Sequence, residues 1–274
     1  MTMPQETSPQ IGLPDRRLGL LRSLGASRDT IGTVVVVLVI AAVAQIVSGH
    51  VPAYIMPEPL VVIGAIGTLL TESYVDIAVT MARLLAAMLC SMLIGSAIGM
   101  VMGLFESVRP FLRSLIVIDT GIPALSWMLI AVFWFKDPET RIFFILTVIL
   151  LPFYALTVYE GVRALSKDLV EMVDTFQPTK WQVLRKLILP HTVAYVLIAT
   201  KSAVGYATRM VVFAELIGSA VGIGAQMNMA QSNFQIDRIL GWTCLLVILN
   251  LLMQASVDVI DRRLLKWRPE ATVR

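Results

Sequence analysis

Long apolar runs separated by short polar segments dominate the pattern of this 274-residue chain. A helix needs about 20 residues to cross roughly 30 Å of hydrocarbon, and six runs are long enough or nearly so. Lipid offers the backbone no hydrogen-bond partner and no strand-like alternation persists, so helices are predicted for these runs. They cover residues 31–49, 84–105, 114–135, 142–159, 191–217 and 239–257. The predicted fold is an all-α polytopic membrane helical bundle of about six transmembrane helices.

Composition supports the membrane assignment. Apolar residues make up 57% of the chain and charged residues only 15%, against about 45–50% and 25% in ordinary soluble domains. The formal net charge of +3 is too small to suggest a nucleic-acid partner. Membrane lipid is the partner that this composition indicates.

The basic residues divide unevenly between the segments that connect the runs. The terminal segments and the alternate connections on their side contain sixteen Lys and Arg residues, whereas the other connections contain Arg83, Lys136, Arg141 and Arg238. Because basic residues stay on the cytoplasmic side, both termini are predicted to be cytoplasmic. The segments are then a cytoplasmic N-terminal part, 1–30, a membrane domain, 31–257, and a cytoplasmic tail, 258–274.

The segment of residues 160–190 is the largest on the cytoplasmic side. Apolar residues at helical spacing, with Asp168 as a start signal, predict a first helix that Pro178 ends. Thr179 and Gln182 form a capping-box pattern for a second helix, which is predicted to end at Pro190. Such an amphipathic unit either docks into a groove of a partner protein or lies on lipid headgroups, and composition leaves both open.

The sequence of this segment, EMVDTFQPTKWQVLRKLILP (171–190), resembles the cytoplasmic coupling loop of ATP-binding-cassette (ABC) importer permeases. Further similarity extends over residues 52–268 and points to the nitrate/sulfonate/taurine-type subfamily. It includes Lys201, Gly205 and the segment FAELIGSAVGIGAQM (213–227). Four positions depart from the family pattern: Met172 and Val173 replace two alanines, Gln177 replaces a glycine, and Thr208 replaces a tryptophan.

The resemblance implies the permease subunit of a bacterial importer, a multi-pass protein of the inner membrane that carries a small anionic solute. It implies cytoplasmic ATPase subunits, a second permease copy and an external substrate-binding protein as partners. The residues expected to couple to the ATPase are Asp168, Glu171, Met172, Thr175, Phe176, Gln177, Pro178, Lys180 and Trp181. The alternative is a self-sufficient secondary transporter or channel.

Catalytic chemistry has no candidate in the sequence. A G-x-x-x-x-G-K-[ST] phosphate loop does not occur, so this chain is expected to be no enzyme and to hold no cofactor. ATP and Mg²⁺ are expected on the partner ATPase. His50 and His191 are too isolated to predict a metal site, and neither has a nucleophile that it could activate.

Four ionisable residues fall inside the predicted spans: Asp119, Lys201, Arg209 and Glu215. Charges in a membrane are costly, which makes these residues candidates for a translocation pathway. Lys201 and Arg209 lie about 80° apart around a helix and could face one cavity that attracts an anion. The alternative is that Asp119 and Glu215 neutralise them in structural ion pairs.

Three glycines in the second predicted span recur at intervals of four residues. Gly95, Gly99 and Gly103 share one helix face, where a neighbouring helix can approach closely. We expect a helix-packing seam there.

Overall fold

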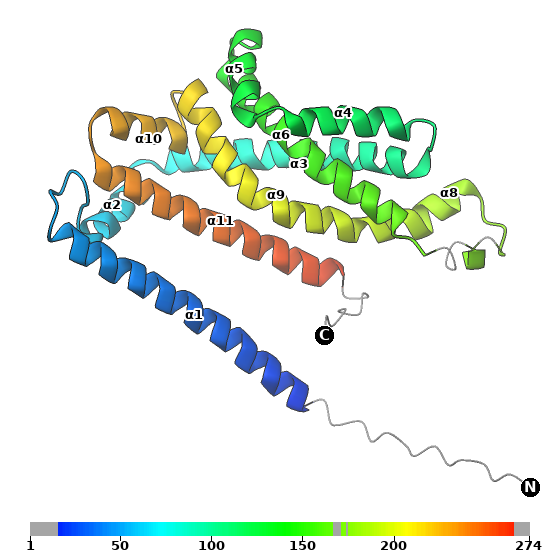
Figure 1. Ribbon diagram of the computed structural model, residues 1–274, viewed down its shortest axis with the longest axis horizontal. Coiled ribbons are helices and arrows are strands. Elements are labelled where there is room, and N and C mark those ends of the chain that lie inside the picture. Colours follow the sequence, from blue (N-terminus) through cyan, green and yellow to red (C-terminus); the bar gives the residue numbers. More distant parts are fainter. Residues whose placement is uncertain (1–15, 167–170, 174, 266–274) are drawn as a thin grey trace, which may run out of the picture. The chain divides into compact units, whose positions relative to one another are not determined.

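The computed structural model describes residues 16–166, 171–173 and 175–265, and within these ranges the regular structure is helical (Figure 1). The chain forms two units, Met1–Val61 and Val62–Arg274. The first contains α1 (Arg16–Ser48), and α2 (Pro59–Glu72) begins at its end. The helices of the second unit are α3 (Tyr74–Leu104), α4 (Arg109–Gly121), α5 (Ala124–Trp134), α6 (Pro138–Arg163), α8 (Lys180–Val183), the π-helix η1 (Leu184–Ile188), α9 (Leu189–Gly218), α10 (Ile223–Ser232) and α11 (Ile236–Leu264).

Four helical segments are long and apolar enough to cross a membrane: α3, α6, the α8–α9 segment and α11. The bent pair α4 and α5 brings the number to five if it forms one span. α1 contains a further apolar stretch, Val34–Ser48. The all-α membrane bundle is thus confirmed, with four or five helical segments of spanning length in the part of the chain that the structure describes.

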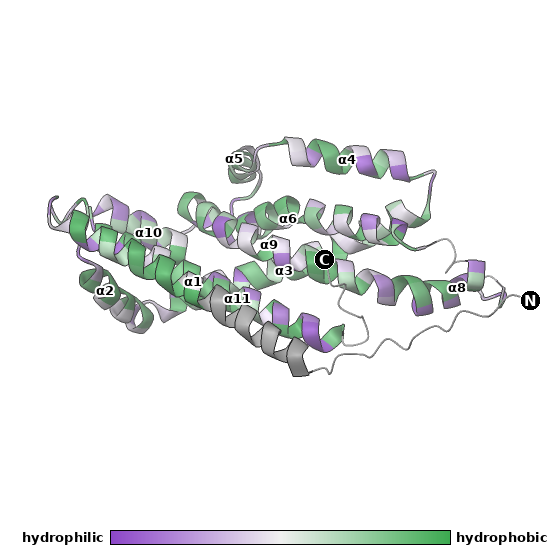
Figure 2. Ribbon diagram, turned by 60° about the horizontal axis from the view of Figure 1, so that its bottom comes forward, coloured by the Kyte–Doolittle hydropathy of each residue, from purple (hydrophilic) through white to green (hydrophobic). Residues whose placement is uncertain are grey.

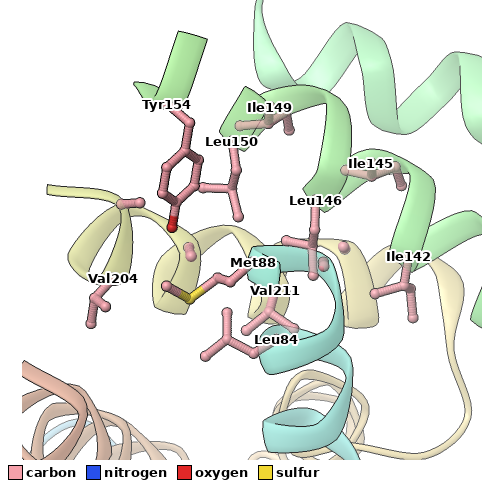
Figure 3. Close-up of a cluster of buried hydrophobic side chains, with 14 of the residues drawn as sticks. Leu84, Met88, Ile142, Ile145, Leu146, Ile149, Leu150, Tyr154, Val204 and Val211 are labelled. Carbon is pink, nitrogen blue, oxygen red and sulfur yellow. The ribbon is translucent and has the colours of Figure 1, made fainter. Parts of the chain in front are cut away.

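The hydrophobic core of the second unit lies between α3, α6 and α9 (Figure 3). Leu84 and Met88 project from α3 toward Leu146 and Leu150 of α6, and Val211 of α9 closes the cluster. The outer surfaces of the helices remain apolar (Figure 2), with many exposed leucine, isoleucine and phenylalanine side chains. Such a surface is suited to lipid or to further subunits rather than to water.

The three glycines of α3 lie against α6. A Cβ atom added at Gly95 would lie 2.7 Å from the backbone oxygen of Leu151, and one added at Gly99 would lie 2.5 Å from that of Ala155. At Gly103 the added atom would lie 2.6 Å from Val162 Cβ. Hydrogen is therefore the only side chain that allows this approach of the two helices.

The third predicted span, 114–135, is not one straight helix. It is divided into α4 and α5, which meet at an angle of 95°. Pro123 has no N–H to donate, and it forces Ile122 into an extended conformation, with φ −83° and ψ 123°. The prediction of an uninterrupted helix was wrong because apolar run length was given more weight than this proline.

The predicted end of the second cytoplasmic helix at Pro190 was also wrong. The helix that begins at Lys180 continues to Gly218, through Pro190. In a regular α-helix, the ring of Pro190 would clash with the carbonyl one turn earlier. The wider π-helical turn η1 lies just before Pro190, and in it the Leu189 N–H donates to the Leu184 carbonyl. Coupling segment and membrane helix are therefore one continuous element.

Candidate functional site

The cytoplasmic segment predicted to contact an ATPase lies at one end of the second unit, and α10 lies at the other (Figure 1). Asp168 is outside the described residues. Thr179 Oγ1 accepts from the Gln182 N–H, and the Gln182 side chain accepts from the Thr179 N–H, so the capping box is present. Met172, Phe176 and Trp181 are exposed, whereas Ile188 is buried against the bundle.

The position of the missing family glycine is Gln177, which has a φ of 47°. This is the left-handed region, which a residue with a Cβ enters only at a steric cost. The turn that the resemblance associates with glycine is therefore formed here by glutamine followed by Pro178. Glu171, Thr175 and Lys180 are exposed beside it.

The four intramembrane charges do not pair with one another. Lys201 Nζ lies 2.9 Å from Asp258 Oδ1 and 2.6 Å from Asp261 Oδ2 of α11. Because Asp258 and Asp261 are three residues apart on a helix, both carboxylates reach the same ammonium. The expectation that Asp119 or Glu215 would neutralise Lys201 was wrong.

Glu215 is fully buried, with 0% of its side chain exposed, and is paired with Arg83 of α3. Arg83 Nη1 lies 2.8 Å from Glu215 Oε1, and Thr80 Oγ1 lies 2.9 Å from both Glu215 oxygens. Glu139, at the start of α6, accepts from Arg83 Nε at 2.8 Å. Sequence analysis had placed Arg83 in a loop, but it lies within α3 and is buried.

The same side chains bind the first N–H groups of α10. Gly222 N–H donates to Asp76 Oδ1 at 2.8 Å, Ile223 N–H to Thr80 Oγ1 at 2.9 Å, and Gly224 N–H to Glu215 Oε2 at 3.0 Å. The free N–H groups at the start of a helix require such acceptors, and negative charge is favourable there. Residues of α3 and α9 therefore hold α10 in place.

Arg209 lies in different surroundings. It lines a cavity of about 370 Å³ between α9 and α11, together with Thr208, Thr243 and Asn250. Lys201 is not among the lining residues, so the two cations do not share this cavity. Among the described residues, no carboxylate forms a salt bridge with Arg209, and its guanidinium is exposed.

Asp119 lies at the break between α4 and α5 and lines a second cavity, of about 250 Å³. Trp127, Phe153 and Tyr206 contribute aromatic walls to it. The Trp127 Nε1–H is buried and has no hydrogen-bond partner within the described part of the chain. No group of three or more His, Cys, Asp or Glu residues in that part could hold a metal ion.

Sequence reasoning missed Asp76, Thr80 and Arg83, although their spacing of four and three residues places them on one face of α3. That polar face in an apolar helix was a usable signal. Their hydrogen bonds to Glu215 could not be predicted from the sequence, because 132 residues separate Arg83 from Glu215.

Comparisons with known proteins relate the chain to transport systems. The family described as "binding-protein-dependent transport system inner membrane component" matches residues 91–266. The taurine transport system permease protein TauC of Escherichia coli is 24% identical over 248 residues, which are 88% of this chain and 90% of that protein. The riboflavin transport system permease protein RibX of Chloroflexus aurantiacus is 26% identical, over 96% of this chain and 98% of its own. The putative aliphatic sulfonates transport permease protein SsuC of Bacillus subtilis is 28% identical over 54% of this chain and 53% of its own.

Solved structures share the fold at low sequence identity. A chain of the MetNI methionine ABC transporter, in an inward-facing conformation, has a TM-score of 0.59 and 20% identity, covering 72% of this chain and 96% of its own. A chain of an amino acid ABC transporter has a TM-score of 0.60 and 16% identity, over 69% of this chain and 92% of its own.

Proposed function

Since the chain belongs to the family of binding-protein-dependent transport system inner membrane components, and is an ABC importer permease subunit of the inner membrane, we propose that it carries a small anion past Arg209. A self-sufficient secondary transporter or channel is the weaker reading, because family membership favours a subunit that acts with an ATPase and a binding protein. A solute of the nitrate, sulfonate or taurine type would suit the relatives TauC and SsuC.

The observation that carries the proposal is the Arg209 cavity. Its guanidinium and the side-chain amide of Asn250 offer N–H donors to an oxyanion. Thr208 and Thr243 also line the cavity, but their O–H groups donate to the backbone oxygens of Val204 and Ile239. A planar guanidinium can bind two oxygens of such a group at once. Lys201 is less suitable, because Asp258 and Asp261 already neutralise it.

Substitution of these two cations tests the proposal. In the assembled transporter in liposomes, Arg209→Gln should lower uptake of a sulfonate probe at least about tenfold while the complex stays assembled. Lys201→Gln should instead lower thermal stability, because it leaves two carboxylates without their cation. Full uptake by the Arg209 variant would contradict the proposal, as would an equal loss of stability in both variants.

The ATPase contact is proposed for the segment that includes Glu171, Thr175 and Lys180. Its apolar side chains Met172, Phe176 and Trp181 are exposed in the part of the chain that the structure describes, and they suit a hydrophobic groove. Cysteines at Glu171, Thr175 or Lys180 should crosslink to the ATPase subunit. If all three failed in a complex that still transports, this contact would be rejected.

The assembly proposed is two copies of this chain with two ATPase subunits, which bind ATP and Mg²⁺, and an external binding protein. Two copies give two coupling segments related by closed symmetry. The distribution of Lys and Arg supports cytoplasmic termini, an orientation with α8 inside and α10 outside. Movement of the coupling segments would then switch the pathway, lined by α4, α5 and α9, between its two sides.

A further inference from the structure

The turn between α10 and α11 has an unusual residue at its strained position. Phe234 has a φ of 57°, in the left-handed region. The Gln235 N–H donates to the Ala230 carbonyl and the Phe234 N–H to the Gln231 carbonyl, which is the hydrogen-bond pattern of a Schellman motif. Glycine is the usual residue at this place because it has no Cβ to clash with the following carbonyl.

Packing does not account for the phenylalanine. Its side chain is among the most exposed apolar groups in the described residues, at 88%. The preceding residues, Gln231, Ser232 and Asn233, are polar and exposed as well. Contacts with the described residues of the second unit therefore do not compensate the strain, and strain of this kind is concentrated at functional positions.

The helix that presents Phe234 is held firmly. Acceptors from Asp76, Thr80 and Glu215 bind the N–H groups at the start of α10, and the Gln226 side chain also donates to Asp76 at 2.9 Å. A short helix fixed at one end by buried side chains places the residue at its other end with little freedom. This is the arrangement that a preformed binding surface requires.

We propose that Phe234 is the anchor by which the external binding protein docks on this permease, with α10 as a rigid platform. The inference rests on the proposed orientation, which puts α10 outside the membrane, opposite α8 (Figure 1). Systems of this family depend on a binding protein. Exposed aromatic anchors contribute a large share of the energy of protein interfaces, and the polar residues around Phe234 favour an aqueous partner over hydrocarbon.

The test uses the complete transporter in nanodiscs and its own purified binding protein. Phe234→Gly should raise the dissociation constant for the binding protein at least about tenfold. It should not lower Tm, since glycine relieves the left-handed strain. Phe234→Tyr should keep the affinity close to that of the unchanged protein. An unchanged affinity in the glycine variant would overturn the proposal, and so would a loss of affinity accompanied by a fall in Tm, which would mean that the ring is structural.

Phe111→Ala is the matched control, because Phe111 is another strongly exposed phenylalanine, at 76%, and lies in the first turn of α4. Its affinity for the binding protein should stay unchanged. A loss of affinity in Phe234→Gly that occurs in nanodiscs but not in detergent would indicate a lipid anchor and would overturn the proposal.

Orientation is tested separately with a cysteine at Ser232 and a membrane-impermeant maleimide. Labelling from outside supports the orientation, and if docking then fails, the proposed transport function still stands. Labelling only from the cytoplasmic side overturns both the orientation and the docking inference.

Discussion

The two carboxylates that share Arg83 should differ greatly in their contribution to stability. Glu215 has 0% of its side chain exposed, whereas Glu139 has 61% exposed. In Glu215→Gln the charge opposite the guanidinium is lost. An amide nitrogen then replaces one of two oxygens that lie near donors from Thr80, Arg83 and Gly224.

Removing one partner of a buried ion pair costs about 3–5 kcal/mol. An exposed pair contributes about 0–1 kcal/mol, so Glu139→Gln should change little although it touches the same guanidinium. With a shift of about 2–4 °C per kcal/mol for a chain of this size, Glu215→Gln should lower Tm by about 6–20 °C. The difference arises from burial, because the chemical change is the same in both variants.

Thermal unfolding of the purified permease in one detergent, followed by tryptophan fluorescence, measures both variants side by side. The reasoning would be refuted by equal shifts in Tm, or by a Glu215 variant within about 2 °C of the unchanged protein. A larger effect at Glu139 would also refute it.

Three further substitutions follow from the geometry. Gly99→Ala should lower the free energy of unfolding by about 1–3 kcal/mol, because the added Cβ would lie 2.5 Å from the Ala155 oxygen. Gly205→Ala is the control: the nearest atom to its added Cβ is 3.8 Å away, so its Tm should be unchanged or higher. Thr179→Ala removes the capping box and should destabilise the start of α8 by about 1 kcal/mol, seen as weaker coupling of ATP hydrolysis to uptake; normal coupling would contradict this. Gln177→Gly should raise Tm by relieving about 1–2 kcal/mol of left-handed strain, and a fall in Tm would argue against that strain.

Hydropathy alone was enough to find the membrane helices, because a long apolar run in lipid must satisfy its own backbone hydrogen bonds, and a helix does so. Local chemistry also predicted the start of α8, since Thr179 and Gln182 act within one turn. It failed at Pro190, because a wide turn can accommodate a proline that would otherwise end a helix. The break at Pro123 was readable from the sequence and was overlooked.

The partners of the charged residues were beyond the reach of the sequence. Lys201 forms ion pairs with Asp258 and Asp261, which are 57 and 60 positions away in the sequence, and no local pattern favours these residues over Asp119. This pairing decides which charges remain available to a solute. The sequence alone could therefore not show that Lys201 is paired and Arg209 is not. The residues that hold α10 were hidden for the same reason.

The unbroken helix from Lys180 to Gly218 has a mechanical consequence. Its 39 residues span about 58 Å at 1.5 Å per residue. One end lies beside the exposed segment proposed to contact the ATPase, and Glu215 at the other end is hydrogen-bonded to the start of α10. A tilt or twist imposed on one end is therefore carried toward the other along one continuous helix. The π turn near the Lys180 end is equivalent to one additional residue and sets the rotation of one end about the helix axis relative to the other. Deleting a single residue there would turn one end by about 100° relative to the other.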